Sequence, residues 1–231
     1  MKKSYSAILL DWDDTLWDFQ TNAHVALHEA YKQHHLERYF DSFEHFFHLY
    51  EERNKQLWVE YSKGIIDKQD LQRERFQYPF RMVGKEEYEL AEIVGKDFLE
   101  LTILQNQLLP GALELMQYLA KKYSVVIISN GFKEVQYRKI ASSGLRPYIN
   151  HVVLSEEVGV QKPDRQIFEH ALHLLGLTPQ DVLMIGDNPE TDIKGAMDMG
   201  IDTIYFSPYK KEEIIMPTYT VRSLKEIMNI I

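Results

Sequence analysis

The chain has no cysteine among its 231 residues. Disulfide bonds and thiolate chemistry are therefore excluded. It also has no apolar run close to the roughly 20 residues that a transmembrane helix needs. Its start, Met1-Lys2-Lys3-Ser4-Tyr5, shows neither the apolar stretch nor the small-residue cleavage site of a secretory leader. We therefore expect no leader, no membrane partner and a cytoplasmic location.

The chain also has fewer basic residues than acidic ones. Lysine and arginine number 26 against 35 aspartates and glutamates, which gives a formal net charge of −9. A negative overall field disfavours a nucleic acid polymer as partner. A small anion remains possible, because a few cations and a metal can dominate inside a cleft. The expected partner is therefore a small molecule, and the oligomeric state stays open.

Hydrophobic residues make up 45% of the chain and aromatic residues 12%, which is enough to fill a core. The stretch from residue 17 to residue 109 has helical periodicity and few glycines, so it predicts a small helical bundle. The helices expected in it cover residues 23–35, 43–63, 68–76 and 87–101. Its aromatic stripes are expected to form the bundle's core.

Strands and helices alternate after Pro110, which predicts an α/β fold with a mostly parallel sheet and helices on both faces. The expected strands cover residues 8–10, 125–128, 151–154, 182–185 and 203–206. Residues 1–16 and 110–231 would form this core. Residues 17–109 would be an insertion after the first strand, placed over the carboxyl edge of the sheet as a lid.

Polar side chains follow three of the expected strands. Asp11 and Asp13 come after the first strand, and their spacing of two directs both side chains the same way in extended chain. Unpaired acids cannot stay inside a buried strand, so these must emerge at its carboxyl end, where open parallel sheets keep their ligand sites. Thr15 also follows the first strand, and the second strand, the fourth strand and a loop between them add Ser129, Asn130, Lys162, Asp187 and Asp192 at this edge.

These residue types divide into two functions. Carboxylates attract Mg²⁺, which prefers oxygen ligands and usually takes one or two carboxylates with water. A lysine, hydroxyls and main-chain N–H groups hold a tetrahedral anion. A metal beside an anion site predicts phosphoryl transfer, and a carboxylate can serve as its nucleophile. No Walker-type glycine loop is present, which excludes that class of nucleotide triphosphatase.

Four segments carry the candidate residues: Asp11-Trp12-Asp13-Asp14-Thr15-Leu16, Ser129-Asn130, Lys162-Pro163-Asp164 and Gly186-Asp187-Asn188-Pro189-Glu190-Thr191-Asp192. Together they resemble the four motifs of the haloacid dehalogenase (HAD) superfamily, in the family's order and over nearly the whole chain. The resemblance implies a Rossmann-like core with a helical cap domain, of the C1 type, inserted after the first motif.

The resemblance also implies roles. Asp11 would be the nucleophile that attacks phosphorus, and Asp13 the general acid and base that protonates the leaving oxygen and then activates water. The phosphate would be held by Thr15, Ser129, Asn130 and Lys162. Mg²⁺ would be bound by Asp11, the backbone carbonyl of Asp13, and Asp187. Asp192 would orient either the surroundings of the metal or Lys162.

Asp13 separates branches of the superfamily, because its dehalogenases lack this second acid and its phosphatases have it. At position 14 the common motif has glycine where this chain has Asp14, which we interpret as a tolerated turn residue.

Within the C1-capped phosphatases, the segment from Asp11 to Phe19, the cap length and the last motif resemble the YjjG family of pyrimidine 5′-nucleotidases. This implies hydrolysis of nucleoside 5′-monophosphates.

Several alternatives stay open at this point. The substrate could be a sugar phosphate or another small metabolite, or the enzyme could be a phosphomutase of the same fold. A phospho-accepting receiver module also uses acids and a lysine, but it is about half this length and has no cap. Cap aromatics such as Trp17, Phe19, Trp58 and Tyr61 could contact a base, although packing accounts for each of them more simply.

Overall fold

The computed structural model describes residues 4–208 and 216–231. Residues 1–3, part of the segment from which we expect no leader, lie outside the described residues. The chain divides into two compact units: Met1–Phe19 with Asn106–Ile231, and Gln20–Gln105. None of the helices in the described ranges is long and apolar enough to cross a membrane.

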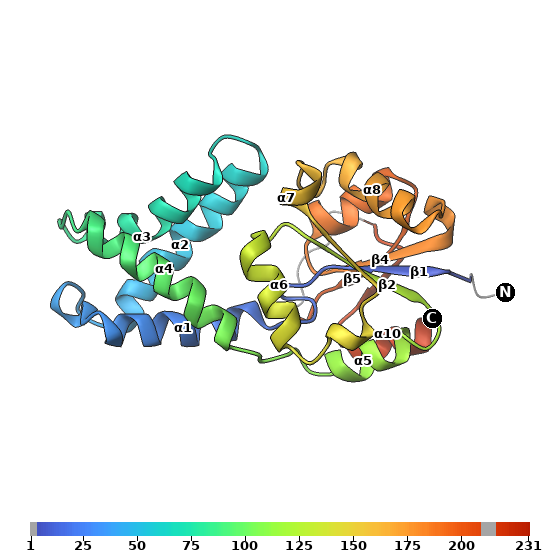
Figure 1. The fold of residues 1–231 in the computed structure, drawn as a ribbon, viewed down its shortest axis with the longest axis horizontal. Helices are drawn as coiled ribbons and strands as arrows, with labels where there is room; N and C mark the ends of the chain where they lie inside the picture. Colours follow the sequence, from blue (N-terminus) through green and yellow to red (C-terminus); the bar gives the residue numbers. More distant parts are fainter. Residues whose placement is uncertain (1–3, 209–215) are drawn as a thin grey trace. The chain divides into compact units, whose positions relative to one another are not determined.

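The first unit is built on one six-stranded sheet with strand order β3-β2-β1-β4-β5-β6, in which every neighbouring pair is parallel. Figure 1 labels β1, β2, β4 and β5 of this sheet. The strands are β1 Ala7–Leu10, β2 Ser124–Ser129, β3 His151–Leu154, β4 Val182–Gly186, β5 Asp202–Phe206 and β6 Tyr219–Val221. The predicted α/β, Rossmann-like fold is therefore confirmed.

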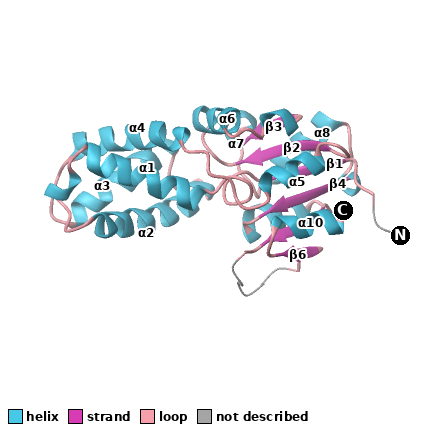
Figure 2. Cartoon of the chain, turned by 90° about the horizontal axis from the view of Figure 1, so that it is seen from below, coloured by secondary structure: helices cyan, strands magenta, loops and turns pink. Residues whose placement is uncertain are grey.

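Helices cover both faces of this sheet (Figure 1), and Figure 2 shows the strands from one of these two sides. They are α5 Ala112–Leu119, α6 Lys133–Ser142, α7 Ser155–Val158, α8 Arg165–Leu175, α9 Gly195–Asp198 and α10 Leu224–Ile230. Apolar residues of α5 and α10 pack with Ile8 and Leu10 on one face, and residues of α8 and α9 pack with Ala7 and Leu9 on the other. Both faces are thus buried, which explains why the strands are continuous apolar runs.

The central position of β1 places the candidate site. Leu10, the last residue of β1, is in register with Ile127 of β2 on one side and Ile185 of β4 on the other. The carboxyl ends of three neighbouring strands therefore lie side by side. The chain order reverses direction across the sheet at β1, which is where open α/β sheets form their ligand crevice.

The second unit contains four helices, α1 Phe19–Gln33, α2 Phe43–Ser62, α3 Lys68–Met82 and α4 Tyr88–Leu104, the first of which begins in the other unit. Aromatic rings from three of them form its core. The ring of Tyr50 lies 5.2 Å from that of Phe76 and 5.7 Å from that of Phe98, measured between centroids. Asp67 caps α3 by accepting a hydrogen bond from the N–H of Asp70.

Three boundaries differ from the sequence-based expectation. Helix α3 continues past residue 76 to Met82 and includes Pro79, because the buried positions Pro79 and Phe80 extend its apolar face. Helix α1 begins at Phe19, four residues before the expected start. Strand β6 was not expected, because it has three residues of which two are exposed, and so it carries no apolar run.

The two connections between the units run antiparallel to each other. Trp17 and Leu108 form a β-bridge. The N–H of Asp18 donates to the carbonyl of Gln107 at 3.1 Å, and the N–H of Leu109 donates to the carbonyl of Leu16 at 2.9 Å. The chain thus leaves the first unit and returns to it at one point, like the base of a hairpin.

Candidate active site

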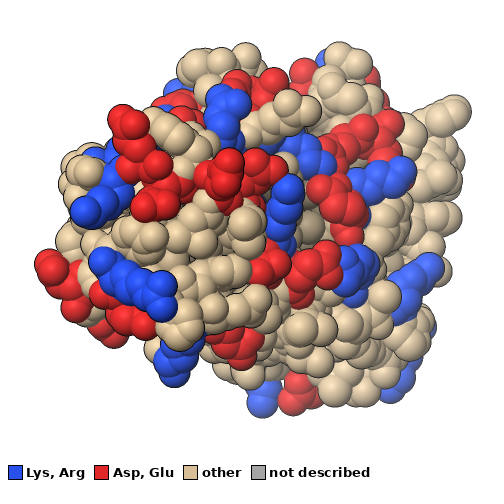
Figure 3. All heavy atoms as spheres, turned by 60° about the vertical axis from the view of Figure 1, so that its left-hand side comes forward, with Lys and Arg blue, Asp and Glu red and all other residues tan. Residues whose placement is uncertain are grey.

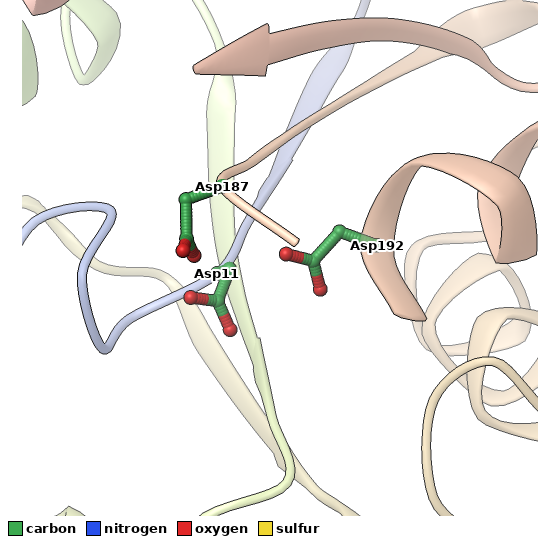
Figure 4. Close-up of side chains that lie close together, drawn as sticks. All are labelled: Asp11, Asp187 and Asp192. Carbon is green, nitrogen blue, oxygen red and sulfur yellow. The ribbon is translucent and has the colours of Figure 1, made fainter. Parts of the chain in front are cut away.

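Three carboxylates converge at the carboxyl edge of the sheet (Figure 4). Asp11 follows β1, Asp187 follows β4, and Asp192 lies in the π-helical turn Pro189–Lys194. One oxygen from each carboxylate lies within 4.8 Å of the others. Adjacent strand ends bring the first two together, and the wide turn after β4 directs the third toward them.

Lys162 is the cation that pairs with two of these three carboxylates. Its Nζ donates to Asp11 Oδ1 at 2.5 Å, to Asp192 Oδ1 at 2.7 Å and to the carbonyl of Ile128 at 2.8 Å. An ammonium group has three hydrogens, so these partners account for all of them. In this arrangement Lys162 orients both carboxylates, and contact with a phosphate requires it to exchange one partner.

Burial and crowding shift the pKa values of these groups. Burial, opposed by Lys162 and assisted by the nearby Asp192 and Asp13, raises the pKa of Asp11 to about 7. Burial and then the charge of Asp11 raise the pKa of Asp187 as well. Burial alone would lower the pKa of Lys162, but Asp11 and Asp192 together raise it above its ordinary value.

The charge balance of the cluster fits a divalent cation. Three carboxylates and one ammonium leave two negative charges uncompensated when all three acids are ionised. Within the described residues, no lysine or arginine pairs with Asp187, whose carboxylate accepts a hydrogen bond from Thr15 Oγ1 at 3.2 Å. A doubly charged ion that prefers oxygen ligands, such as Mg²⁺, would relieve this repulsion.

Asn130 holds the loop that carries Lys162. Its Nδ2 donates to the carbonyl of Lys162 at 3.0 Å, and its Oδ1 accepts from the N–H of Lys162 at 2.8 Å. The amide thus fixes the main chain of Lys162 and keeps one Nδ2 hydrogen besides. Asn130, which was predicted to hold phosphate, therefore also fixes the loop of Lys162. Its position in the sequence did not indicate this second function.

The remaining predicted residues lie around the cluster. Thr15 reaches it through its hydrogen bond to Asp187. Asp13 points to a neighbouring position, where its Oδ2 accepts a hydrogen bond from Gln136 Nε2 at 2.8 Å. The same Nε2 donates to Ser129 Oγ at 2.6 Å, so Asp13 and Ser129 share one partner.

Two residues of α6, Gln136 and Lys139, were not expected at the site. Lys139 Nζ forms an ion pair with Asp13 Oδ1 and is 2% exposed as a residue. Burial lowers the pKa of Lys139, and Asp13 opposes that shift. No spacing in the sequence distinguishes these two residues, because other polar residues, such as Lys133 and Glu134, occur on the same helix.

The aromatic residues considered for base contact differ in burial: Trp17 is fully buried, whereas Phe19, Trp58 and Tyr61 are half-buried. Trp17 is fully buried and its ring centroid lies 3.8 Å from Lys139 Nζ, which supports packing. Phe19 is half-buried beside it, with ring centroids 6.3 Å apart. Trp58 and Tyr61 are half-buried on α2 and contact each other edge to face at 5.8 Å.

Charges of both signs are mixed over the molecular face shown in Figure 3. Lysine and arginine side chains there lie among aspartates and glutamates. Ion pairs of this kind recur along the helices, for example Lys96 with Glu92 and Lys194 with Asp198. The charge on this face is therefore of both signs, as expected for a chain with 26 basic and 35 acidic residues.

Comparison with known proteins identifies the family to which the chain belongs. The family model described as "haloacid dehalogenase-like hydrolase" matches residues 5–200. The pyrimidine 5′-nucleotidase YjjG of Escherichia coli is 34% identical and covers 95% of both chains. The pyrimidine 5′-nucleotidase PynA of Streptococcus pneumoniae is 32% identical over 97% of this chain and 94% of its own.

A solved structure extends the comparison to the fold. The HAD-hydrolase YfnB of Bacillus subtilis, described as bound to magnesium and as revealing interdomain movement, has a TM-score of 0.88 at 28% identity, with 99% of both chains covered. Hydrolases of this family use Mg²⁺, in agreement with the predicted cofactor and the acidic cluster. On the family match, the near full-length relatives and the site geometry together, the chain belongs to the haloacid dehalogenase-like hydrolases.

Proposed function

We propose that this protein is a Mg²⁺-dependent phosphomonoesterase that works through an aspartyl-phosphate on Asp11, and that its substrates are pyrimidine nucleoside 5′-monophosphates. The observation that carries the proposal is the convergence of Asp11, Asp187 and Asp192, two of which pair with Lys162, with the second acid Asp13 beside them. A metal site, an oriented nucleophile and a separate proton donor are the groups that this reaction needs.

In the first step, a carboxylate oxygen of Asp11 attacks phosphorus while the bond from phosphorus to the leaving oxygen breaks. The Asp13 carboxyl group gives a proton to that oxygen as the bond breaks. The products are an alcohol, an aspartyl-phosphate and an Asp13 carboxylate. The contact from Lys162 to Asp11 Oδ1 supports this assignment, because it orients the carboxylate.

In the second step, the Asp13 carboxylate takes a proton from water as the water oxygen attacks phosphorus. The bond from phosphorus to Asp11 breaks, which releases inorganic phosphate and restores the Asp11 carboxylate and the protonated Asp13. One residue serves as acid and then as base, so no other proton carrier is needed. The partial exposure of the Asp13 side chain, 30%, supports access by water.

The phosphate would be held by the hydroxyls of Thr15 and Ser129, by Asn130 and by Lys162. Mg²⁺ would be bound by Asp11, the backbone carbonyl of Asp13, and Asp187, with Asp192 orienting Lys162. When bound, the ion neutralises phosphate charge and stabilises charge that develops in the transition state. The contact between Asp192 and Lys162 at 2.7 Å supports the role given to Asp192.

The helical insertion, residues 17–109, is proposed to serve as a C1-type cap for the core formed by residues 1–16 and 110–231. A cap of this kind would exclude water during the first step and would carry the contacts that select the leaving group. Residues 20–105 form a compact unit of their own, which supports this division. A cytoplasmic location belongs to the same proposal.

A phosphate-release assay with Mg²⁺ tests the proposed function. We expect uridine and thymidine 5′-monophosphates to be cleaved faster than sugar phosphates, and we expect Asp11→Asn to abolish release. Faster cleavage of a sugar phosphate would show that the substrate class is wrong, and it would leave the proposed mechanism unchanged. Formation of an isomer with little free phosphate would identify a phosphomutase instead, and full activity of Asp11→Asn would overturn the mechanism.

A further inference from the structure

Helix α6 holds both oxygens of the Asp13 carboxylate. Gln136 Nε2 donates to Oδ2 at 2.8 Å, and Lys139 Nζ donates to Oδ1. Gln136 and Lys139 stand three apart on the helix, so their side chains extend from the same face. Asp13 is therefore fixed by two neighbouring donors that belong to neither the metal cluster nor the four sequence motifs.

The same glutamine determines how the Ser129 hydroxyl can act. Ser129 Oγ accepts hydrogen bonds from the N–H of Gly131 at 3.1 Å and from Gln136 Nε2 at 2.6 Å. A hydroxyl has two lone pairs and one hydrogen, so two accepted bonds leave the hydrogen free to be donated. Gln136 thereby makes Ser129 a hydrogen-bond donor, which an anionic phosphate requires.

The amide orientation of Gln136 is determined by its partners. If it were reversed, Oε1 would lie against the Asp13 carboxylate, and two acceptors would face each other. Gly131 provides the room for this side chain, because a Cβ at position 131 would lie 2.5 Å from the Gln136 Cδ. The Gln136 side chain therefore depends on three parts of the chain: helix α6 carries it, Gly131 leaves room for it, and Asp13 accepts its hydrogen bond.

Lys139 acts through Asp13 and not on the substrate. It is 2% exposed, and its Nζ lies 3.8 Å from the ring centroid of Trp17 and 5.7 Å from that of Phe19. A buried ammonium that lost its carboxylate partner would be strongly destabilised. The burial of Lys139 thus commits it to Asp13 and keeps it from contact with the leaving group.

We propose that Gln136 and Lys139 are positioning residues, which hold the Asp13 carboxylate for proton transfer and orient the Ser129 hydroxyl toward the phosphate. This inference rests on the proposed phosphatase function. It assigns the two residues separate effects: Lys139 acts on proton transfer alone, whereas Gln136 acts on proton transfer and on phosphate binding.

The effect of Lys139 should depend on the leaving group. A nucleoside hydroxyl must be protonated as it leaves, whereas p-nitrophenolate leaves without a proton. For Lys139→Met we expect kcat/KM for uridine 5′-monophosphate to fall about 100-fold, and that for p-nitrophenyl phosphate to change less than about threefold. Equal losses on both substrates would overturn the role of Lys139.

Lys133→Met is the matched control. Lys133 also lies on α6 and pairs with an acid, Glu157 at 2.8 Å, but its side chain is 55% exposed, whereas that of Lys139 is 3% exposed. We expect this variant to keep both rates. A wild type that released no phosphate from any monoester would refute the proposed function itself, which separates that failure from a failure of the inference.

Gln136→Met gives an independent measurement if Lys139→Met fails to fold. Inhibition by inorganic phosphate should weaken roughly tenfold in Gln136→Met, the scale of one hydrogen bond to a charged group, and stay unchanged in Lys139→Met. In an Asp13→Asn background, Lys139→Met should add almost nothing to the loss on uridine 5′-monophosphate. Unchanged phosphate inhibition in Gln136→Met, or additive losses in the double variant, would contradict the proposal.

Discussion

Asp14 occupies a backbone conformation that most side chains avoid. Its φ is 58°, in the left-handed region, and its N–H donates to the carbonyl of Trp17 at 2.8 Å to close a tight turn. Glycine adopts this conformation without strain, and aspartate tolerates it better than most residues do. The turn thus explains both the glycine of the common motif and the aspartate that replaces it here.

Substitution at position 14 should change stability according to the backbone. We expect Asp14→Gly to fold and to keep its phosphatase activity, and Asp14→Val to lower the free energy of unfolding by about 1–2 kcal/mol, because valine is strained at positive φ. Urea unfolding monitored by circular dichroism measures the difference. If the valine variant were as stable as the glycine variant, the strain argument would fail.

Gly186 allows Asp192 to approach Lys162. A Cβ at position 186 would lie 2.3 Å from Asp192 Oδ2, so Gly186→Ala must displace that carboxylate. We expect a loss of stability of about 1–3 kcal/mol from overpacking, together with a fall in kcat.

Gly144→Ala is the control for this substitution. Gly144 has a φ of 75°, and a Cβ there would meet no atom of the described residues within 4 Å, so alanine introduces backbone strain without a clash. We expect Gly144→Ala to lose stability and to keep kcat in phosphate release. A full kcat in Gly186→Ala would mean that Asp192 does not orient Lys162.

The strand ends are the part of the structure that the sequence predicted best. Each strand of the central four is an apolar run, and Asp11, Ser129 and Asp187 mark the carboxyl ends of three of them. Because parallel strands share one carboxyl edge, the chain order alone was enough to predict that these side chains meet.

Helix-borne contacts were harder to predict. Gln136 and Lys139 are polar residues on a helix, and polar residues on a helix usually face solvent. Their burial follows from the distance between α6 and the first acidic loop, which local periodicity does not encode. Strand β6 was missed for a related reason: it is defined by its pairing with β5 rather than by its own composition.

Mg²⁺ should stabilise the protein at the ends of β1 and β4. At a concentration of 100 times its Kd, a ligand adds about 2.7 kcal/mol, or a Tm increase of several degrees for a chain of this size. We expect this increase in differential scanning fluorimetry near pH 7.5. We expect it to be lost in Asp187→Asn, and an equal increase in that variant would contradict the assignment.

The magnesium effect should shrink in acid. Burial raises the pKa of Asp11 to about 7, so the folded metal-free protein binds more protons than the unfolded chain between about pH 4 and 7. The contribution of Asp11 to the stability of the metal-free protein therefore falls as pH rises through that window. Mg²⁺ competes with those protons, so the Tm increase should be smaller at pH 5.5 than at pH 7.5. A shift independent of pH would contradict this coupling.

At the scale of the whole molecule, the core has its own sheet and two buried apolar layers, and the insertion has its own aromatic core. The chain passes between the two units through the paired segments at Trp17 and Leu108. Because these segments already form the base of a hairpin, the insertion joins the core in the way that a long loop joins two strands.

The core should therefore fold without the insertion. Replacing residues 20–105 by Gly-Gly leaves a loop of about four residues, a common hairpin length. We expect a cooperative unfolding transition and a Tm increase with Mg²⁺, because the metal cluster lies wholly in the core. A core that lacks secondary structure in circular dichroism would show that the units depend on each other for folding.

Covalent phosphorylation of Asp11 is the central claim of the proposed function. The most direct measurement is acid quenching of the wild-type protein during turnover of uridine 5′-monophosphate with Mg²⁺, followed by peptide mass spectrometry. The proposal predicts a phosphoryl group on Asp11, and none in Asp11→Asn, which should also release no phosphate. Steady release of phosphate by Asp11→Asn, with no phosphoryl group on Asp11 in the wild type, would contradict it.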